Sequence, residues 1–204
     1  LGYLIEGPIN DRSTYIASYR MSYLDIIADA INASGGMPSY DDFQAKLEFR
    51  PDIYNTFSLL IINGGSLYER DKNGAINVGE TEYGKLKNNQ LTIGINYKHI
   101  WNKRAYSNTS ISNSIKESDA RFFNIYSDST VFKIIENSDV RSLRQVNHFK
   151  LGSESKMEIG FDVEINETDY NYYRKLTKSS LFINEIQFDR MVSSTNYAAF
   201  FTLK

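Results

Sequence analysis

The sequence predicts an all-β protein, an antiparallel up-and-down sheet that forms part of a transmembrane β-barrel. Three observations predict this fold class. Apolar and polar residues alternate along many segments, no apolar run is long enough for a spanning helix, and short connections alternate with long ones. We expect residues 1–204 to be part of one barrel domain with about nine strands and a short helix in one loop.

The clearest strand is QLTIGINYKHIW, residues 90–101, which is followed by the turn Asn102-Lys103-Arg104 and a second alternating run. Its side chains repeat with a period of 2, which predicts one apolar face and one polar face. The apolar side holds Leu91, Ile93, Ile95, Tyr97 and Trp101, and the polar side holds Thr92, Gly94, Asn96 and Lys98.

The composition excludes a helical membrane protein. Hydrophobic residues make up 41% of the chain, the mean hydropathy is -0.43, and the longest apolar run extends only from Tyr197 to Phe201. A spanning helix needs roughly 20 apolar residues, whereas a membrane strand escapes such a test because every second residue is polar. The 15 Tyr and 12 Phe residues fit a soluble β-protein with a tyrosine-rich surface equally well.

The charge balance excludes several partners and sites. A net charge of -2, from 23 basic and 25 acidic residues, provides no basic field, so we expect no nucleic-acid partner. The chain has no cysteine, which excludes disulfides and thiolate metal sites. Because it begins at Leu1 without a signal peptide, we expect a mature chain, a trimmed chain or a piece of a longer one.

The amino-terminal half predicts four strands separated by turn residues. Alternation predicts strands at residues 1–9, 14–24, 43–50 and 56–68, and Gly64-Gly65 in the last of these predicts a β-bulge. Between the second and third strands, Leu24, Ile27, Ala28 and Ile31 repeat at helical spacing before Gly35-Gly36, which predicts the short helix; a strand extension is the alternative.

The carboxy-terminal half predicts five more strands. They lie at residues 91–101, 106–115, 142–151, 157–165 and 197–204. Residues 71–89 and 116–139 are polar and are expected to be long loops, whereas 166–195 have no clear pattern. Together with residues 31–41, these two predicted loops would help to form the outer mouth of a barrel.

The order of the connections indicates how the sheet lies in a membrane. Tight turns are expected near Asn10, Asp52, Lys103 and Ser153, and longer polar loops lie between them. In a meander, all short turns then fall at one end and all long loops at the other, as in membrane barrels; a soluble sandwich is the alternative. An odd number of strands indicates that further strands belong to the barrel.

Three segments carry a family resemblance. Residues 3–25 (YLIEGPINDRSTYIASYRMSYLD) end in Arg20, Tyr23, Leu24 and Asp25 and resemble the early barrel of TonB-dependent outer-membrane receptors of the Bacteroidetes type. Residues 97–112 (YKHIWNKRAYSNTSIS) and residues 150–173 are similar to two hairpins of the same family. The three motifs occur in the family's order and together span nearly the whole chain.

The resemblance implies a bacterial outer-membrane location and a part in energy-coupled uptake of a ligand. It also implies partners: the lipid bilayer, the receptor's own plug domain and missing barrel strands, a periplasmic energy-coupling protein and a surface lipoprotein. The family has about twice as many strands as this chain, which shows neither a plug nor a coupling box. These receptors are not enzymes, so no catalytic, cofactor-binding or metal residue is carried over, and the ligand-binding residues are unknown.

Other functions remain open alternatives. The chain could belong to a non-transporting outer-membrane barrel, such as an adhesin or a subunit of a secretion or motility complex. It could also be a secreted soluble β-domain that binds glycan or protein. An enzyme is the least favoured class, because Ser-His-Asp chemistry needs a histidine beside a nucleophile and the chain has only His99 and His148.

The residues that could carry chemistry have simpler structural interpretations. His99 is expected in an interfacial aromatic belt and His148 in the barrel wall, and two distant histidines make a zinc site improbable. Asp71-Lys72-Asn73-Gly74 resembles the start of a calcium loop but lacks its later acidic ligands, so a solvated turn is expected.

Two further sets are assigned to the wall itself. The carboxylates of Glu158, Asp162 and Glu164 share a face and are expected to line the lumen, with bases such as Lys46, Arg50 or Lys98 across from them. An aromatic girdle is expected at the short-turn ends, made of Tyr54, Phe57, Tyr97, Trp101 and Tyr106. Because lipid cannot hydrogen-bond the backbone of an open strand edge, residues 1–204 expressed alone are expected to aggregate or to require a partner chain.

Overall fold

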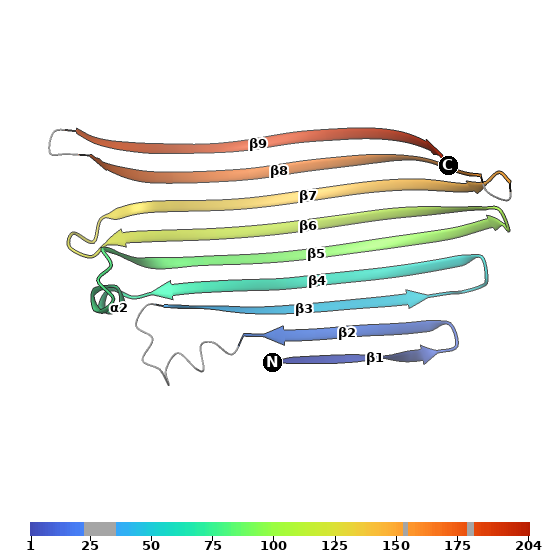
Figure 1. Cartoon of the computed structure of the whole chain (residues 1–204), viewed down its shortest axis with the longest axis horizontal. Coiled ribbons are helices and arrows are strands. Elements are labelled where there is room, and N and C mark those ends of the chain that lie inside the picture. The colour runs from blue at the N-terminus through green and yellow to red at the C-terminus, as the bar shows by residue number, and fades with distance from the viewer. Residues whose placement is uncertain (23–35, 153–154, 179–181) are drawn as a thin grey trace.

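The computed structural model describes residues 1–22, 36–152, 155–178 and 182–204, which form one nine-stranded antiparallel sheet (Figure 1). The strands lie in the order β1 to β9, so each pairs with its neighbours in the chain in an up-and-down meander. Their bounds are β1 (Gly2–Asn10), β2 (Ser13–Met21), β3 (Met37–Phe49), β4 (Asn55–Arg70), β5 (Glu82–Asn102), β6 (Ala105–Asn124), β7 (Thr130–Lys150), β8 (Lys156–Lys178) and β9 (Phe182–Leu203), and a short helix, α2 (Lys72–Asn77), precedes β5.

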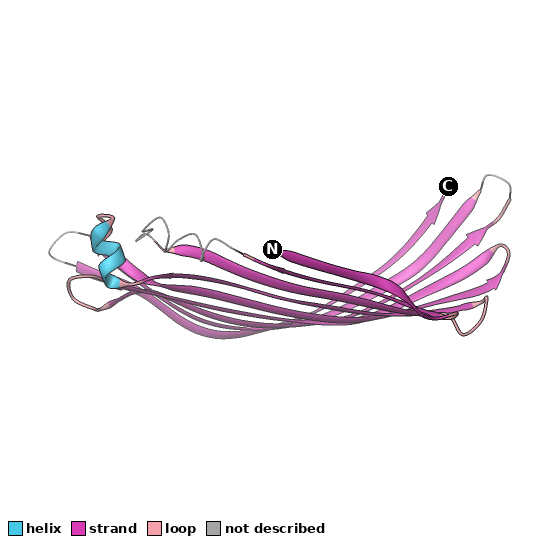
Figure 2. Cartoon of the chain, turned by 90° about the horizontal axis from the view of Figure 1, so that it is seen from below, coloured by secondary structure: helices cyan, strands magenta, loops and turns pink. Residues whose placement is uncertain are grey.

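The sheet is curved but not closed. β1 and β9 each pair with one strand only, and Figure 2 shows the sheet bent into a trough that the two edges do not close. This arrangement confirms the predicted fold class of an all-β, up-and-down sheet with the form of part of a barrel wall. Among the described residues, no helix combines the length and hydropathy needed to cross a membrane.

The two faces of the sheet are set by the strand register. Successive residues point to opposite faces, and cross-strand partners share a face. Four hollows in the surface are all lined by the face that includes Glu6, Lys46, Gln90, Arg144 and His148. Hollows form on the inside of a curved sheet, so we call this the concave face. The opposite face, which includes Phe43, Ile61, Ile95 and Phe161, is the convex face.

The four connections predicted as tight turns gather at one end, which we call the turn end (Figure 1). Two of them are built alike, because Asn10 Oδ1 accepts a hydrogen bond from the backbone N–H of Arg12 at 2.9 Å and Asn102 Oδ1 accepts from that of Arg104 at 2.8 Å. Each of these hairpins also has a register shift just before its asparagine. Side-chain acceptors of this kind fold the backbone back locally, so the sequence itself closes these hairpins.

The opposite end, the loop end, differs from the prediction. Residues 71–89 and 116–139 are not long loops, because β5 begins at Glu82, β6 continues to Asn124 and β7 starts at Thr130. The unassigned region 166–195 also belongs largely to β8 and β9, which end and begin at Lys178 and Phe182. Long connections at the loop end are therefore confined to the amino-terminal half, and the predicted asymmetry of the ends is only partly correct.

Two smaller predictions have different outcomes. The predicted bulge at Gly64-Gly65 is wrong, because both glycines pair in unbroken register with β3 and with β5. Gly64 lies against the backbone of Asp41 and Asp42, so a Cβ there would sit within 3.3 Å of its neighbours. The helix predicted over residues 24–31 lies outside the described residues.

The sheet has almost no hydrophobic core. Among the described residues, the buried apolar side chains are only Ala75, Ala120, Ile125 and Val146. The solvent-accessible surface is 14088 Å², whereas a compact monomer of this mass exposes about 9800 Å². The chain is therefore not a soluble globule that packs its apolar rows against each other, and those rows have to be covered by something else.

Candidate functional site

The convex face carries an apolar band along the turn half of the sheet, the half nearer the turn end. Its aliphatic side chains are open to the surroundings, since Ile95 is 53% exposed and Ile111 is 58% exposed. In β1–β6, from the row through Tyr19 and Leu91 to the turn end, the paired convex positions include no Asp, Glu, Lys or Arg. An exposed apolar surface of this extent marks a contact with another apolar phase or a partner.

Aromatic side chains border this band at the turn end. Phe57 and Tyr97 stack with their ring centroids 4.6 Å apart, and Trp101 meets His99 edge-on at 4.5 Å. Asn55 Oδ1 lies 2.8 Å from His99 Nδ1 and accepts a 2.7 Å hydrogen bond from the Tyr97 hydroxyl. This network places His99 among the rings of the aromatic border.

Tyr106 does not belong to this aromatic border, so that part of the predicted girdle is wrong. It pairs with Ile100 and His148 and therefore lies on the concave face, where its ring stacks on His148 at 4.3 Å. The alternation changes phase across the hairpin because of the register shift between Ile100 and Asn102. His148 is thus a wall residue, as predicted, and it lies on the opposite face from His99.

Small polar side chains are frequent on the concave face of the turn half in β5, β6 and β7. Ser110 accepts a hydrogen bond from the Asn96 amide at 2.8 Å, and the hydroxyls of Ser112 and Ser142 lie 2.7 Å apart. Thr92 and Ser114 form a similar pair at 2.8 Å. Because these groups satisfy one another across strands, the concave face presents a hydrated, hydrogen-bonded surface rather than an apolar one.

The predicted row of carboxylates does line the concave face, but the neighbouring basic side chains differ from the expected ones. Asp162 lies 3.6 Å from the Arg144 guanidinium, and Glu158 lies 3.4 Å from His148 Nδ1. Both partners are on the adjacent strand β7, directly across in the register. Among the described residues, no ion pair joins Lys46, Arg50 or Lys98 to these carboxylates, because Lys46 and Arg50 pair with Glu48 and the strand β7 provides the nearest basic groups.

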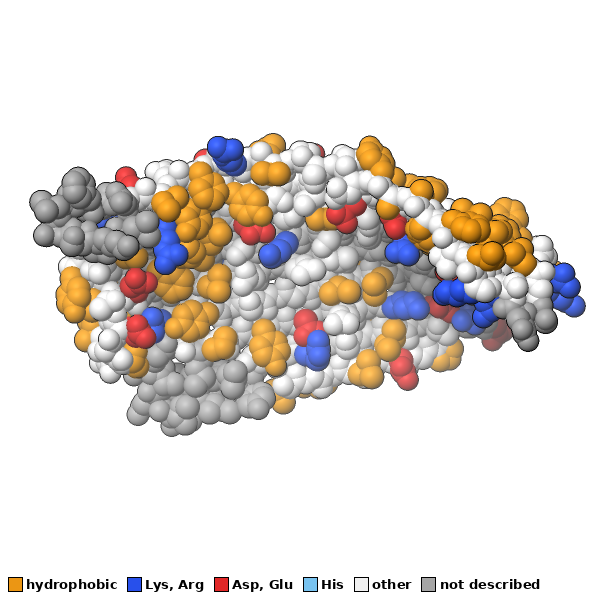
Figure 3. Space-filling view, turned by 45° about the horizontal axis from the view of Figure 1, so that its top comes forward, with side chains coloured by type: hydrophobic (Ala, Val, Ile, Leu, Met, Phe, Trp, Pro, Cys, Tyr) orange, Lys and Arg blue, Asp and Glu red, His pale blue; other side chains and the backbone are white. Residues whose placement is uncertain are grey.

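In the loop half, the half nearer the loop end, the two faces exchange character. Convex positions there carry charges, among them Glu69, Lys85, Lys87, Asp119 and Lys133. The concave face instead carries a chain of rings across four strands. Phe132 lies 6.3 Å from Phe122 and 5.9 Å from Tyr172, which stacks on Phe188 at 5.0 Å. Figure 3 shows apolar side chains gathered near the loop end of the hollowed surface.

Helix α2 is tied to the connection between β6 and β7 at the loop end. Lys72 Nζ lies 2.6 Å from Asp128 Oδ1, which also accepts a hydrogen bond from the Tyr83 hydroxyl at 3.1 Å. The hydrogen bond from Lys72, and after it that from Tyr83, lowers the pKa of Asp128. Desolvation of the hydroxyl, and after it the hydrogen bond to Asp128, raises the pKa of Tyr83.

Asp71 starts helix α2 rather than a solvated turn. Its Oδ1 accepts a 2.7 Å hydrogen bond from the backbone N–H of Gly74, which makes it the helix N-cap. The Asp-Lys-Asn-Gly run is therefore explained by capping and by the Lys72 ion pair. Within the described part of the chain, no group of three or more His, Asp or Glu residues could hold a metal ion.

The described residues thus define a curved, open, up-and-down sheet with two chemically different faces. No family model matches the chain, and no curated protein sequence matches it. Among solved structures, it is similar to the ferric-catecholate import receptor Fiu from E. coli K12 in an open form, at 7% sequence identity and a TM-score of 0.47. The alignment covers 99% of this chain and 48% of that one, so the chain spans about half the length of that receptor.

Proposed function

We propose that this chain is part of the wall of a TonB-dependent receptor in a bacterial outer membrane, and that it takes part in energy-coupled uptake of a ligand. The observation that carries the membrane assignment is the apolar band on the convex face, free of charged residues in β1–β6, of a sheet that has almost no core. Lipid covers that band, and the polar concave face borders a hydrated lumen or a plug.

The height of the band supports this proposal. In β5 it extends from Leu91 to Trp101, which is about 33 Å along a strand that rises roughly 3.3 Å per residue. Barrel strands tilt by about 35–45°, so the band is about 25 Å tall across the bilayer, as in outer-membrane barrels. The aromatic border of Tyr97, His99 and Trp101 then lies at the periplasmic interface.

The receptor assignment and its partners rest on the three sequence motifs at residues 3–25, 97–112 and 150–173. On this proposal, the partners are a plug domain and further strands of the same receptor, a periplasmic energy-coupling protein and a surface lipoprotein. The concave surface contributes the lumen wall past which the ligand moves, and no covalent chemistry is assigned to it.

The membrane part of the proposal is tested with single cysteines in the parent protein, because residues 1–204 contain none. Ile95→Cys on the convex face and Asn96→Cys on the concave face are labelled with a fluorophore in outer-membrane vesicles. A lipid-soluble quencher is expected to quench the label at residue 95 and a water-soluble quencher the label at residue 96. Equal quenching at both positions would overturn the membrane assignment.

The uptake part needs a separate test. The parent protein is cross-linked in cells with and without the periplasmic energy-coupling protein, and its cross-linked partner is identified by mass spectrometry. Capture of that coupling protein supports a receptor. A correctly inserted barrel that never contacts the coupling protein would instead indicate a non-transporting barrel, such as an adhesin or a subunit of a secretion complex.

A further inference from the structure

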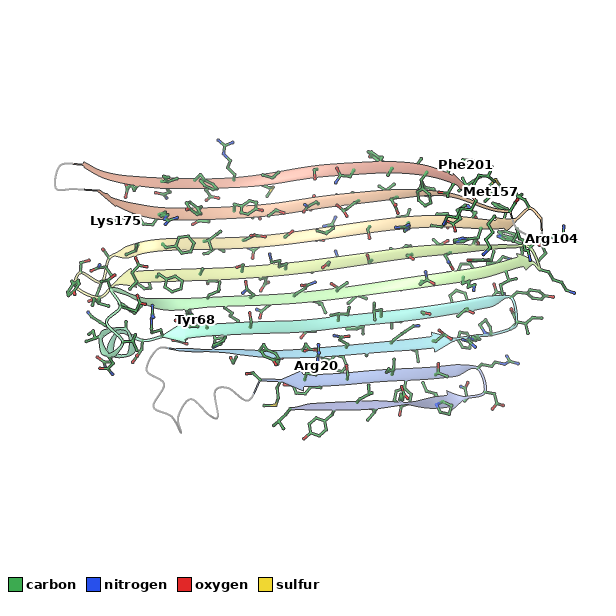
Figure 4. The ribbon with its side chains drawn as sticks, viewed as in Figure 1. Arg20, Tyr68, Arg104, Met157, Lys175 and Phe201 are labelled. Carbon is green, nitrogen blue, oxygen red and sulfur yellow. The ribbon has the colours of Figure 1, made fainter. Side chains whose placement is uncertain are left out.

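Four cations lie in one register row at the turn end of the sheet. The backbone N–H of Lys150 donates a 2.7 Å hydrogen bond to the Arg104 carbonyl, and Lys150 pairs with Lys156 in the β7–β8 ladder. Lys156 exchanges backbone hydrogen bonds of 2.8 and 2.9 Å with Lys204. The row therefore runs from Arg104, just before β6, across the ends of β7 and β8 to Lys204, just after β9. Figure 4 labels Arg104 and Met157, the residue after Lys156, at this end.

The row borders a hollow on the concave face. This hollow has a volume of about 410 Å³ and is lined by Arg104, Lys150 and Lys156 together with Lys98 and Lys103.

Tyr106 and His148 form an aromatic floor beside these charges. Their rings stack at 4.3 Å, and Lys98 Nζ lies 4.7 Å from the centre of the Tyr106 ring. The one acidic side chain of the lining, Glu158, is 3.4 Å from His148. The hollow therefore combines a dense positive charge with a flat apolar surface.

The cations of the row differ from four other cations on the concave face. Arg20, Lys46, Lys116 and Arg144 each lie within 3.6 Å of a carboxylate on the same face. Across the described ranges, by contrast, no ion pair joins Arg104, Lys150, Lys156 or Lys204 to an acidic residue. Like charges placed directly across strands repel, so this row is stabilised when an anion lies along it.

We infer that the row binds an acidic, extended polypeptide segment from the part of the receptor that fills the barrel lumen. This inference rests on the proposed function, because it takes the concave face to be the lumen wall. Lipid headgroups are disfavoured as the anion, since the row faces away from the apolar band. Four neighbouring strands span about 14 Å, the length of roughly four extended residues. A short run of Asp and Glu side chains therefore matches the row in charge and in length.

The test uses the full parent protein in its native membrane, with the photo-reactive residue p-benzoylphenylalanine at position 106. This residue resembles the tyrosine it replaces and leaves every cation of the row in place. The cross-linked peptide, identified by mass spectrometry, is expected to be an acidic segment of the same receptor. The same probe at position 110 on the concave face, outside the hollow, is expected to capture that segment far less.

Charge variants then test the recognition itself. Lys150→Glu with Lys156→Glu is expected to lower the cross-link yield by about tenfold, whereas Lys150→Arg with Lys156→Arg keeps it. Barrel insertion is checked in parallel with the quenching of the label at residue 95, so failure of the membrane assignment is distinguished from failure of this inference. An inserted barrel that captures a lipid, a separate protein, a segment without acidic residues or nothing overturns the inference.

Discussion

The turn half and the loop half of this sheet both alternate apolar and polar residues along their strands, but the faces that carry the two kinds of residue differ. In the turn half, apolar side chains such as Ile95 lie on the convex face and polar ones such as Asn96 on the concave face. In the loop half, Lys85 and Lys133 lie on the convex face while Phe122 and Phe132 lie on the concave face. The strand register continues unbroken through both halves of β5 and β6. The change in which face carries the apolar side chains is therefore not caused by the end of a strand.

This difference shows what surrounds each part of the wall. On our proposal, lipid contacts the convex face only in the turn half, and the loop half projects into water, where charges are favoured outside. The concave rings of the loop half then provide an apolar surface near the outer mouth, whereas the concave turn half carries many small polar side chains, such as Thr92, Ser110 and Ser112. Figure 4 labels Tyr68 and Lys175 in the loop half and Phe201 in the turn half.

The strongest test of this comparison places a charge in the apolar band. Ile95→Lys is expected to lower the free energy of unfolding of the parent protein by about 2–4 kcal/mol, because the ammonium enters the middle of the bilayer. The matched control Asn96→Lys points to the polar face and is expected to cost far less. Urea unfolding in lipid vesicles measures both variants, and equal losses would contradict the assignment of the two faces.

A second test concerns packing on the concave side of the turn half. A Cβ at Gly160 would lie 2.5 Å from Phe200 Cζ and 2.6 Å from the Gln145 carbonyl oxygen. Gly160→Ala is therefore expected to destabilise the sheet by about 1–3 kcal/mol in the same assay. Gly94→Ala is the control, since its Cβ would make an ordinary 3.5 Å contact with Ser112. A neutral Gly160→Ala would show that β8 and β9 are not so closely packed.

The rings of the loop half predict a smaller effect. Phe132→Ala removes the ring that contacts Phe122 and Tyr172, and is expected to cost about 1–2 kcal/mol because the side chain is only half-buried. Its neighbour on the convex face, Lys133→Ala, is expected to change the free energy of unfolding by less than about 0.5 kcal/mol. If Lys133→Ala lowered the free energy of unfolding more than Phe132→Ala, the concave face of the loop half would not be its packed, apolar face.

The smallest effect is expected at the loop end, at Asp128. Its pKa is lowered from the usual 3.8 by the hydrogen bonds from Lys72 and then Tyr83. Because the pKa of Asp128 is lower in the folded state than in the unfolded state, its carboxylate stabilises the folded state fully above pH 3.8. This stabilisation is lost as the pH falls through the pKa of the folded state. Hydrogen exchange of the amides in α2 should therefore accelerate in acid, and Asp128→Asn should accelerate it at neutral pH.

A control for this prediction comes from the turn end. The pKa of Asp52 is also lowered, first by the hydrogen bond from the Asn55 side chain and then by that from the Tyr54 backbone. Asp52→Asn should loosen its own turn and leave α2 unchanged. If exchange in α2 responded equally to both substitutions, the tie between Lys72 and Asp128 would not hold the helix.

Sequence patterns were sufficient to predict the strands of the turn half and the hairpins that join them. Phe43 to Phe49 and Met157 to Ile165 alternate cleanly between an apolar convex face and a polar concave face, and Asn10 and Asn102 mark the turns, where their side chains accept hydrogen bonds from the nearby backbone. The loop half was misassigned because strands were expected only where apolar residues form one face and polar residues the other. Lys85, Lys87 and Asp119 indicated a loop, although they lie on regular strands.

The row of four cations and the carboxylate pairs of the concave face were harder to predict, because strand register and not local pattern brings their parts together. Arg104, Lys150, Lys156 and Lys204 belong to different segments, and nothing in each segment indicates the others. The partners of Asp162 and Glu158 were misassigned for the same reason, since only the pairing of β7 with β8 places Arg144 and His148 across from them. A correct register drawn from the hairpin turns would have revealed both.

The two free margins of the trough set the order in which such a wall can be assembled. Along β1 and β9 the outward N–H and C=O groups have no strand beside them in the described sheet, and hydrocarbon offers them no replacement. On our proposal, a wall with these two edges unpaired is therefore not stable in the bilayer on its own. The strands β1 and β9 need to be paired with other β-strands before the sheet is stable in lipid.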